Sequence, residues 1–326
     1  MLTSSRSFFD ARILTRSAVV GGLVWMGLLF APLAVAGPLA DVATVLLLGV
    51  LVVVPLALDV AATPGRDGRN ALPYRLAVLV HPIGALGACA SFFVPAGQTA
   101  AVLGAPWMLF TVFVALEGLR RLLEHIKTRT LSVHVLVTSV GFLYLPGGSG
   151  WLFLSRLGAD PGPYGELIVL LTAVHFHFAA FVAPVWAGKL GSSAAADRSK
   201  TYPAFRVVGV GLIAGTPLVA MGIAGSPTIE TIGVMLLTAS AFGLGSMGLL
   251  QAPRFPDRQG AIMLGLSAAS LCLAMLWAFA FNLGPRFGWP SPDVIAMIPR
   301  HGWLNGVGFG LIGMLAWRRL RSTCEC

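Results

Sequence analysis

The sequence predicts an all-α, polytopic helical transmembrane bundle of about ten spans, with both termini in the cytoplasm. Hydrophobic residues make up 56% of its 326 residues and charged residues only 11%, whereas about a quarter of a soluble domain is charged. The apolar residues gather in stretches close to the ~20 residues that cross a hydrocarbon core. Once these stretches are counted as spans, nineteen of the 22 lysine and arginine residues fall on one side. Basic residues near span ends stay cytoplasmic, which sets the expected orientation.

The expected spans alternate with short connections. The N-terminus, the C-terminus and the connections after even-numbered spans carry the basic residues, and the opposite face holds only Arg156, Arg286 and Arg300. The connections leave no room for a soluble domain, so we expect residues 1–326 to form one integral membrane domain. Residues 1–16 are its basic cytoplasmic N-terminus and 318–326 its cytoplasmic tail. In chain order, the spans are expected near 17–36, 40–60, 75–95, 100–119, 131–146, 166–187, 206–224, 229–250, 260–282 and 301–317.

Proline and glycine mark where these elements should end or bend. Gly37-Pro38, Pro146-Gly147-Gly148 and Pro161-Gly162-Pro163 predict turns between spans. Pro82, directly after His81, could break span three, and Pro184 is expected to kink span six. Residues 34–36 read Ala-Val-Ala, which resembles a signal-peptidase site, but an uncleaved first span is favoured.

Ionisable residues inside the spans are the functional candidates, because they are costly in hydrocarbon. Span six carries His175 and His177 about ten residues from its outer end, near the expected bilayer midplane. Residues two apart on a helix point roughly 200° apart, so the two imidazoles should face different sides. Thr172 shares the face of His175 and is a candidate substrate-binding residue. The alternative role for both histidines is a structural polar contact with neighbouring helices.

A second group of polar residues is expected in the outer half of the bundle. His301 and Asn305 open span ten and share a helix face at a spacing of four. His301 is therefore a third catalytic candidate, and a carboxylate beside its imidazole could move a proton. The candidate substrate-binding residues here are Asn305, Asn282, Glu166 and Glu230. For the two glutamates, which lie in first helical turns, stabilisation of the helix dipole is the favoured explanation.

A third group lies nearer the cytoplasm. Glu117 can pair with Arg120 or Arg121 at helical spacing, and such interfacial ion pairs explain most of this group. His81 and His134 lie deeper and are minor candidates.

No cofactor is predicted, because the sequence has no Gly-rich phosphate loop, no His-Glu-x-x-His zinc motif and no nucleophile elbow. A haem or metal site would need His175 or His177 together with a ligand from another helix, such as His301. The net charge of +9 favours contact with anionic lipid head groups. Nucleic acid is a poor partner, since no basic face is concentrated in a folded module.

The motifs of spans six and ten resemble those of YndJ-like integral membrane proteins of bacteria. The resemblance rests on Leu171-Thr172-Ala173 and His175-Phe176-His177 in span six, and on His301-Gly302-Trp303-Leu304-Asn305 in span ten. It covers spans five to ten, including Arg156, whereas the first four spans are merely compatible. Ala180 stands where the family pattern suggests glycine. The resemblance implies a multi-pass protein of the bacterial cytoplasmic membrane, and members of the family are often labelled transporters.

Two classes of function follow. The favoured one is an intramembrane enzyme that performs acid–base chemistry (isomerisation, cyclisation or ring opening) on a lipophilic small molecule entering from the lipid. His175 and His177 would be general acid and base, and Asn305 and Thr172 would position a substrate oxygen. The alternative is a proton-coupled transporter in which the same histidines protonate during alternating access. The lack of an inverted repeat and of paired broken helices disfavours transport.

Overall fold

The computed structural model describes residues 4–63, 70–162 and 164–324, and all its regular elements in these ranges are helical. The predicted all-α class is therefore confirmed. The predicted turn at 161–163 and the cytoplasmic loop after span two are only partly described. Pro163, Arg66, Arg69 and the last two residues of the expected tail lie outside the described residues.

The chain divides into two compact units, Met1–Thr130 with Ser139–Val182, and Leu131–Thr138 with Ala183–Cys326. The single membrane domain expected from the sequence stays a prediction. The first unit holds α1 (Ser4–Leu28), α2 (Pro38–Leu48), η1 (Gly49–Val53), α3 (Val54–Val60), α4 (Leu72–Ser91), α5 (Gln98–Lys127), most of α6 (Val133–Leu157), α7 (Glu166–His177) and η2 (Phe178–Val182). The second unit holds α8 (Ala183–Ala196), α9 (Tyr202–Gly225), α10 (Pro227–Gln251), η3 (Ala252–Arg254), α11 (Arg258–Phe287), α12 (Val294–Met297), η4 (Ile298–Gly302), η5 (Leu304–Leu311) and α13 (Ile312–Cys324).

Within the described ranges, eight helical stretches are long and apolar enough to cross a membrane. They correspond to expected spans two to nine. The first expected span is the helix α1, which ends at Leu28, because Pro32 and Gly37 interrupt the chain that follows. The tenth runs from α12 to α13 through two π-helical segments. The chain is thus a multi-pass membrane protein, and the cytoplasmic location of its termini stays a prediction.

Two of the expected helix ends are wrong. Pro146, Gly147 and Gly148 lie inside α6, which continues to Leu157 instead of turning. In hydrocarbon the backbone groups have no other partners, so a helix continues through glycine and proline that would end it in water. For the same reason α4 continues through Pro82.

The helix α4 shows how these helices pack. Three of its large apolar side chains, Leu79, Ile83 and Leu86, are exposed. Most of its buried residues are small or polar, and they include Ala77, His81, Gly84, Ala85 and Ala88. Because lipid is as apolar as leucine, membrane helices associate through small residues and polar contacts, leaving bulky side chains for the lipid. This arrangement explains why an ionisable residue can lie on the inner face.

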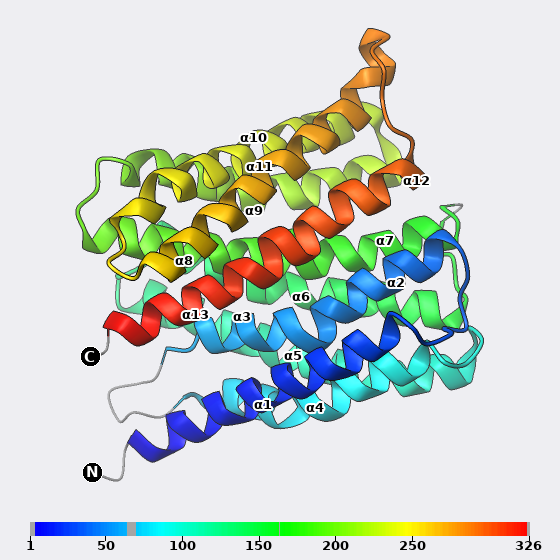
Figure 1. The fold of residues 1–326 in the computed structure, drawn as a ribbon, viewed down its shortest axis with the longest axis horizontal. Helices are drawn as coiled ribbons and strands as arrows, with labels where there is room; N and C mark the ends of the chain where they lie inside the picture. Colours follow the sequence, from blue (N-terminus) through cyan, green and yellow to red (C-terminus); the bar gives the residue numbers. More distant parts are fainter. Residues whose placement is uncertain (1–3, 64–69, 163, 325–326) are drawn as a thin grey trace. The chain divides into compact units, whose positions relative to one another are not determined.

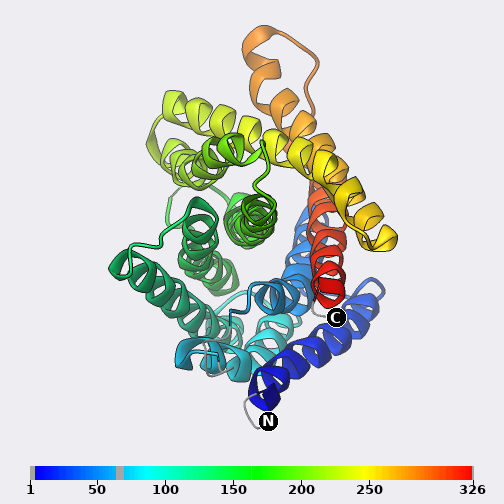
Figure 2. The same cartoon turned by 90° about the vertical axis from the view of Figure 1, so that its left-hand side faces the viewer.

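Neighbouring helices form antiparallel hairpins within each unit. In the first unit α4 packs along α5, and α1 lies against α2, α3 and η1 (Figure 1). In the second unit α9 packs along α10, and α11 contacts α10, α13 and η5 (Figure 2). The hairpin of α4 and α5 brings His81 next to Trp107, which is the starting point of the candidate site.

Candidate functional site

His177, the last residue of α7, is fully buried and both of its ring nitrogens are bonded. Its Nδ1 lies 2.7 Å from the carbonyl oxygen of Ala173, and Trp107 Nε1 donates to its Nε2 at 2.9 Å. A carbonyl only accepts hydrogen bonds and an indole N–H only donates them. The proton must therefore sit on Nδ1, so His177 is held as the neutral tautomer with Nε2 as acceptor.

His81 forms the second half of this arrangement. Its Nε2 lies 3.3 Å from the carbonyl of Val50 and its Nδ1 lies 2.9 Å from the hydroxyl of Ser17. The carbonyl can only accept, so Nε2 carries the proton, and in the neutral ring Nδ1 accepts from the Ser17 hydroxyl. Both ring nitrogens are thus bonded to protein atoms. The sequence had made His81 only a minor candidate.

Trp107 joins the two histidines. Its ring stacks on His177 with centroids 5.8 Å apart and meets His81 edge-on at 5.7 Å. Phe110 packs against both Trp107 and His81, at 4.5 and 5.1 Å. We call His81, Trp107, Phe110 and His177 the Trp107 cluster. Sequence reasoning did not single out Trp107, although its place well inside span four indicated a buried indole that needs an acceptor.

Two π-helical segments lie beside the Trp107 cluster. The segment η2 begins directly after His177, and η1 contains Val50, the partner of His81. The two segments are close, since a Cβ at Gly49 would lie 3.0 Å from the Phe178 ring. Wide π turns inside α-helices occur frequently at functional sites. Both helices continue through these turns, as Pro38–Val60 and Glu166–Ala196, so the expectation of no paired broken helices stays a prediction.

Proline gives a physical reason for both π segments. Pro55 and Pro184 each follow the end of a π segment by two residues. A proline lacks the N–H that would bond the carbonyl four residues earlier, and its ring crowds that carbonyl. Those carbonyls belong to Leu51 and Ala180, which lie inside η1 and η2. The sequence-based expectation that Pro184 distorts span six agrees with this geometry.

The remaining candidates of span six lie elsewhere on the helix. His175 is exposed and its Nδ1 bonds the carbonyl of Leu171 at 2.7 Å. The hydroxyl of Thr172 bonds the carbonyl of Ile168 at 2.7 Å. His175 and His177 therefore present opposite faces of α7, as their spacing implies. Glu166 is exposed in the first turn of α7.

The second unit holds the other predicted group. His301, in η4, donates from Nδ1 to the carbonyl of Ala274 at 2.9 Å. The amide nitrogen of Asn305 lies 3.1 Å from His301 Nε2 and 3.0 Å from the His301 carbonyl, which identifies it as the donor to both. His301 thus has the same tautomer as His177. Glu230 lies in the first turn of α10.

The predicted site residues are thus divided between the two units. His177 joins the Trp107 cluster in the first unit, and His301 pairs with Asn305 in the second. Asn282, on α11, has a buried side-chain oxygen that meets no donor among the described residues. A common cavity for the span-six and span-ten histidines stays a prediction. In the described part of the chain, no three His, Cys, Asp or Glu side chains are grouped as metal ligands.

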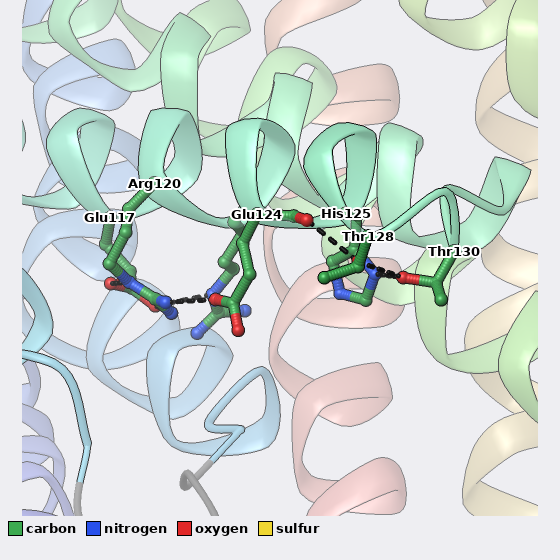
Figure 3. A network of polar contacts seen from close by, with 7 residues as sticks. Glu117, Arg120, Glu124, His125, Thr128 and Thr130 are labelled. Carbon is green, nitrogen blue, oxygen red and sulfur yellow. Dashed lines mark hydrogen bonds and ion pairs between the residues drawn. The ribbon is translucent and has the colours of Figure 1, made fainter.

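A buried ion-pair network occupies the C-terminal half of α5 (Figure 3). Glu117 accepts two hydrogen bonds from Arg120, both at 2.8 Å, and one from Arg121 at 2.7 Å. Arg121 also donates to the carbonyl of Ala61 at 2.9 Å. The predicted pairing of Glu117 with these arginines is confirmed. Its geometry describes a structural link between α5 and the end of α3.

Arg156 is one of the few basic residues expected on the outer face, and its side chain is buried in the structure. It is 2% exposed and donates to the carbonyls of Ser91 and Val94, at 3.3 and 2.9 Å. Its guanidinium also lies 4.7 Å from the Phe92 ring centroid. Ser91 is the last residue of α4, where a positive charge complements the helix dipole, and Val94 lies three residues beyond it. Arg156 therefore acts as a buried helix cap.

The fold and these sites define a polytopic α-helical membrane protein with hydrogen-bonded histidines inside its helices. The chain belongs to the YndJ-like protein family, whose family model matches residues 44–309. The resemblance inferred from spans five to ten is therefore confirmed, and it extends through spans two to four.

A curated relative is the "Uncharacterized membrane protein YndJ" of Bacillus subtilis (strain 168). It is 29% identical over 238 residues, which are 73% of this chain and 41% of the relative. The chain thus spans less than half the length of this relative. No solved structure matches the chain.

Proposed function

We propose that the protein is a proton-coupled transporter of a small molecule, in which His177 binds and releases the coupled proton. The observation that carries this proposal is the fixed tautomer of His177, whose Nε2 accepts from Trp107 while Nδ1 donates to Ala173. Ionisable residues inside membrane helices commonly serve as proton relays in pumps and transporters.

Protonation of His177 would act as a structural switch. It would put a second N–H on the imidazole, so that two donors would face each other where Trp107 now donates to Nε2. The hydrogen bond would be lost, and α5 and α7, which carry the two residues, would have to separate or rotate. A proton bound at one atom would therefore change the packing of two helices.

The surroundings of His177 suit such a movement. The π segment η2 starts at the next residue, and Trp107 also packs on His81, which is bonded to η1. Wide π turns inside membrane helices are frequent at functional sites. A shift of Trp107 would thus reach both π segments of the first unit.

Acid–base catalysis fits this geometry less well. A general acid or base needs a ring nitrogen within hydrogen-bond reach of the substrate. Both ring nitrogens of His177 are bonded to protein atoms, and those of His301 are bonded to Ala274 and Asn305. Transport requires these bonds to change only when the helices move, so it is the better supported function.

Proteoliposomes containing the purified full chain test the proposal. A small-molecule extract of bacterial cells is added outside, a pH gradient is imposed, and the vesicle contents are analysed by untargeted mass spectrometry. We expect at least one solute to accumulate with the gradient and to be lost when nigericin collapses it. His177→Gln should abolish this accumulation, whereas His125→Gln, at an exposed site bonded to Thr130 (Figure 3), should behave as wild type.

Two results would overturn the proposal. One is the absence of any gradient-dependent accumulation by the wild-type protein. The other is the conversion of a lipophilic compound by wild-type protein in detergent, with the conversion lost in His177→Gln. The second result would restore the intramembrane enzyme as the function of this site.

A further inference from the structure

The two imidazoles of the Trp107 cluster differ in the groups that their ring nitrogens meet. Both nitrogens of His81 lie beside oxygen atoms, with the Val50 carbonyl 3.3 Å from Nε2 and the Ser17 hydroxyl 2.9 Å from Nδ1. His177 meets one carbonyl oxygen and the N–H of Trp107. A protonated imidazole donates from both nitrogens, so it needs an acceptor at each. The surroundings of His81 meet this requirement, whereas those of His177 do not.

The Ser17 hydroxyl can serve both protonation states of His81. A hydroxyl donates and accepts, and its hydrogen rotates to suit the partner. It donates to Nδ1 of the neutral ring. When Nδ1 carries a proton, that N–H donates to the Ser17 oxygen instead, and the hydroxyl hydrogen turns away. The Val50 carbonyl keeps its bond from Nε2, so the change requires no movement of a heavy atom.

Burial does not distinguish the two rings. His81 and His177 are both 0% exposed, so the loss of water opposes a positive charge on either of them. The hydrogen-bond partners therefore decide which ring takes up a proton first. Protonation of His177 sets its new N–H against the N–H of Trp107, whereas protonation of His81 keeps two acceptors in place. Hydrogen bonds from a charged donor are roughly twice as strong as neutral ones, which further favours His81.

Neutral groups contact the His81 ring, namely a hydroxyl, a carbonyl and two aromatic rings. The elements that pack against α4 are α1, η1 and α5, and η1 consists of glycine, valine and leucine. On α1, Arg12 and Arg16 are exposed, and Asp10 lies about two turns before the hydroxyl. On α5, the ion-pair network begins at Glu117, about 15 Å along the helix from the indole. The titratable residues of α4 besides His81 are Tyr74, Arg75 and Cys89.

We propose that His81 is a second proton-binding residue, which takes up a proton on Nδ1 before His177 takes one up on Nε2. Water supplies the proton, the lone pair of Nδ1 forms the new N–H bond, and the Ser17 hydroxyl changes from donor to acceptor. Ser17 is half-buried and follows the exposed Arg16, so it is the partner of His81 nearer the surface. The part of His81 in coupling rests on the proposed transport function, whereas its protonation does not.

Nitrogen-15 solid-state NMR of the full chain in proteoliposomes, with labelled histidine, tests the order of protonation. A ring nitrogen without hydrogen gives a signal well separated from that of an N–H, and a protonated imidazole lacks this signal. His81→Gln and His177→Gln assign the two signals. As the pH is lowered in steps, we expect the signal of His81 to disappear first. That of His177 should disappear at a proton concentration at least about tenfold higher, because its protonation breaks a hydrogen bond.

Ser17→Ala removes one acceptor of the charged ring and should raise the proton concentration that protonates His81 about tenfold. Ser246→Ala is the matched control, because its hydroxyl bonds the carbonyl of Phe242 in its own helix, and it should leave both signals unchanged. Wild-type titration of His81 in Ser17→Ala overturns the proposal, as does loss of the His177 signal before that of His81. If Ser17→Ala does not fold, the order measured in the wild-type protein decides.

The vesicle assay separates this inference from the transport function. Accumulation by Ser17→Ala should need a proton concentration about tenfold higher, whereas His177→Gln abolishes accumulation at every pH. If the wild-type protein accumulates no solute but His81 still protonates first, transport is wrong and the proton-binding residue stands. If Ser17→Ala shifts the titration of His81 but accumulates solute with the wild-type pH dependence, His81 has no part in coupling.

Discussion

Replacing Trp107 by phenylalanine removes one N–H donor from a fully buried position and keeps an aromatic ring there. The Nε2 atom of His177 then becomes a buried acceptor without a partner. That loss costs about 1–3 kcal/mol. The missing pyrrole portion of the indole leaves a void that adds roughly 1 kcal/mol. We therefore expect Trp107→Phe to lower the unfolding free energy by about 2–4 kcal/mol.

A double-mutant cycle with His177→Leu separates the hydrogen bond from the lost volume. Interhelical hydrogen bonds in membrane proteins contribute about 0.6 kcal/mol on average and up to about 1.7 kcal/mol. The bond between Trp107 and His177 is 2.9 Å long and fully buried, so we place its coupling energy in the upper half of that range. The double variant should accordingly be less unstable than the two single effects added together.

Unfolding in mixed dodecylmaltoside and SDS micelles measures these free energies. The control pair is Trp25→Phe with His177→Leu, because Trp25 donates to Thr44 instead of to the imidazole. Its effects should add within about 0.5 kcal/mol. A coupling between Trp107 and His177 no larger than that of the control pair would refute the fixed tautomer and, with it, the proton switch.

Three further predictions concern stability. Gly148→Ala should destabilise the protein by about 1–3 kcal/mol in the same unfolding assay, because the added Cβ would lie 2.7 Å from Nδ1 of His177. The control is Gly150→Ala, which has open space around it and should be neutral or slightly stabilising. Glu117→Gln leaves the buried guanidinium of Arg121 without its carboxylate and should cost about 3–5 kcal/mol, whereas Glu124→Gln removes a carboxylate that is 59% exposed and should change stability by less than about 1 kcal/mol. Arg319, which is bonded to Asp257, holds the pKa of that carboxyl below its usual value. The ion pair therefore stabilises the folded protein at pH values above the pKa that Asp257 has in the unfolded chain. This stabilisation is lost as the pH falls through the lower pKa that Asp257 has in the folded protein. Asp257→Asn should therefore flatten the acid side of the melting temperature measured against pH, and an unchanged acid limb would contradict the ion pair.

The sequence predicted the helical spans better than their ends. Hydrophobic length and basic loops located the membrane helices, because both follow directly from the cost of hydrocarbon burial. The turn predicted at Pro146, Gly147 and Gly148 was wrong. Proline and glycine patterns that form turns in water-soluble proteins do not end a helix in lipid, where the backbone has no other hydrogen-bond partners. In α6 these glycines allow close packing instead, with Gly147 against Phe176 and Gly148 against His177.

Part of the candidate site could also be predicted. The helical spacing of four correctly paired His301 with Asn305, and the spacing of two correctly separated His175 from His177. The contacts of His177 could not be found in this way. Trp107 is 70 residues away in sequence, and helical periodicity carries no information about which helices become neighbours.

The sequence by itself determined the protein class, its membrane helices and the presence of histidines within them, because these depend on local hydrophobicity and charge. Only the tertiary structure decided which atoms those histidines bond. The bonds of His177 to Trp107 and of His81 to Ser17 and Val50 fix both tautomers, since a carbonyl can only accept and an indole can only donate. The protonation state of a buried imidazole thus depends on partners that the fold, and not the local sequence, brings within hydrogen-bond distance.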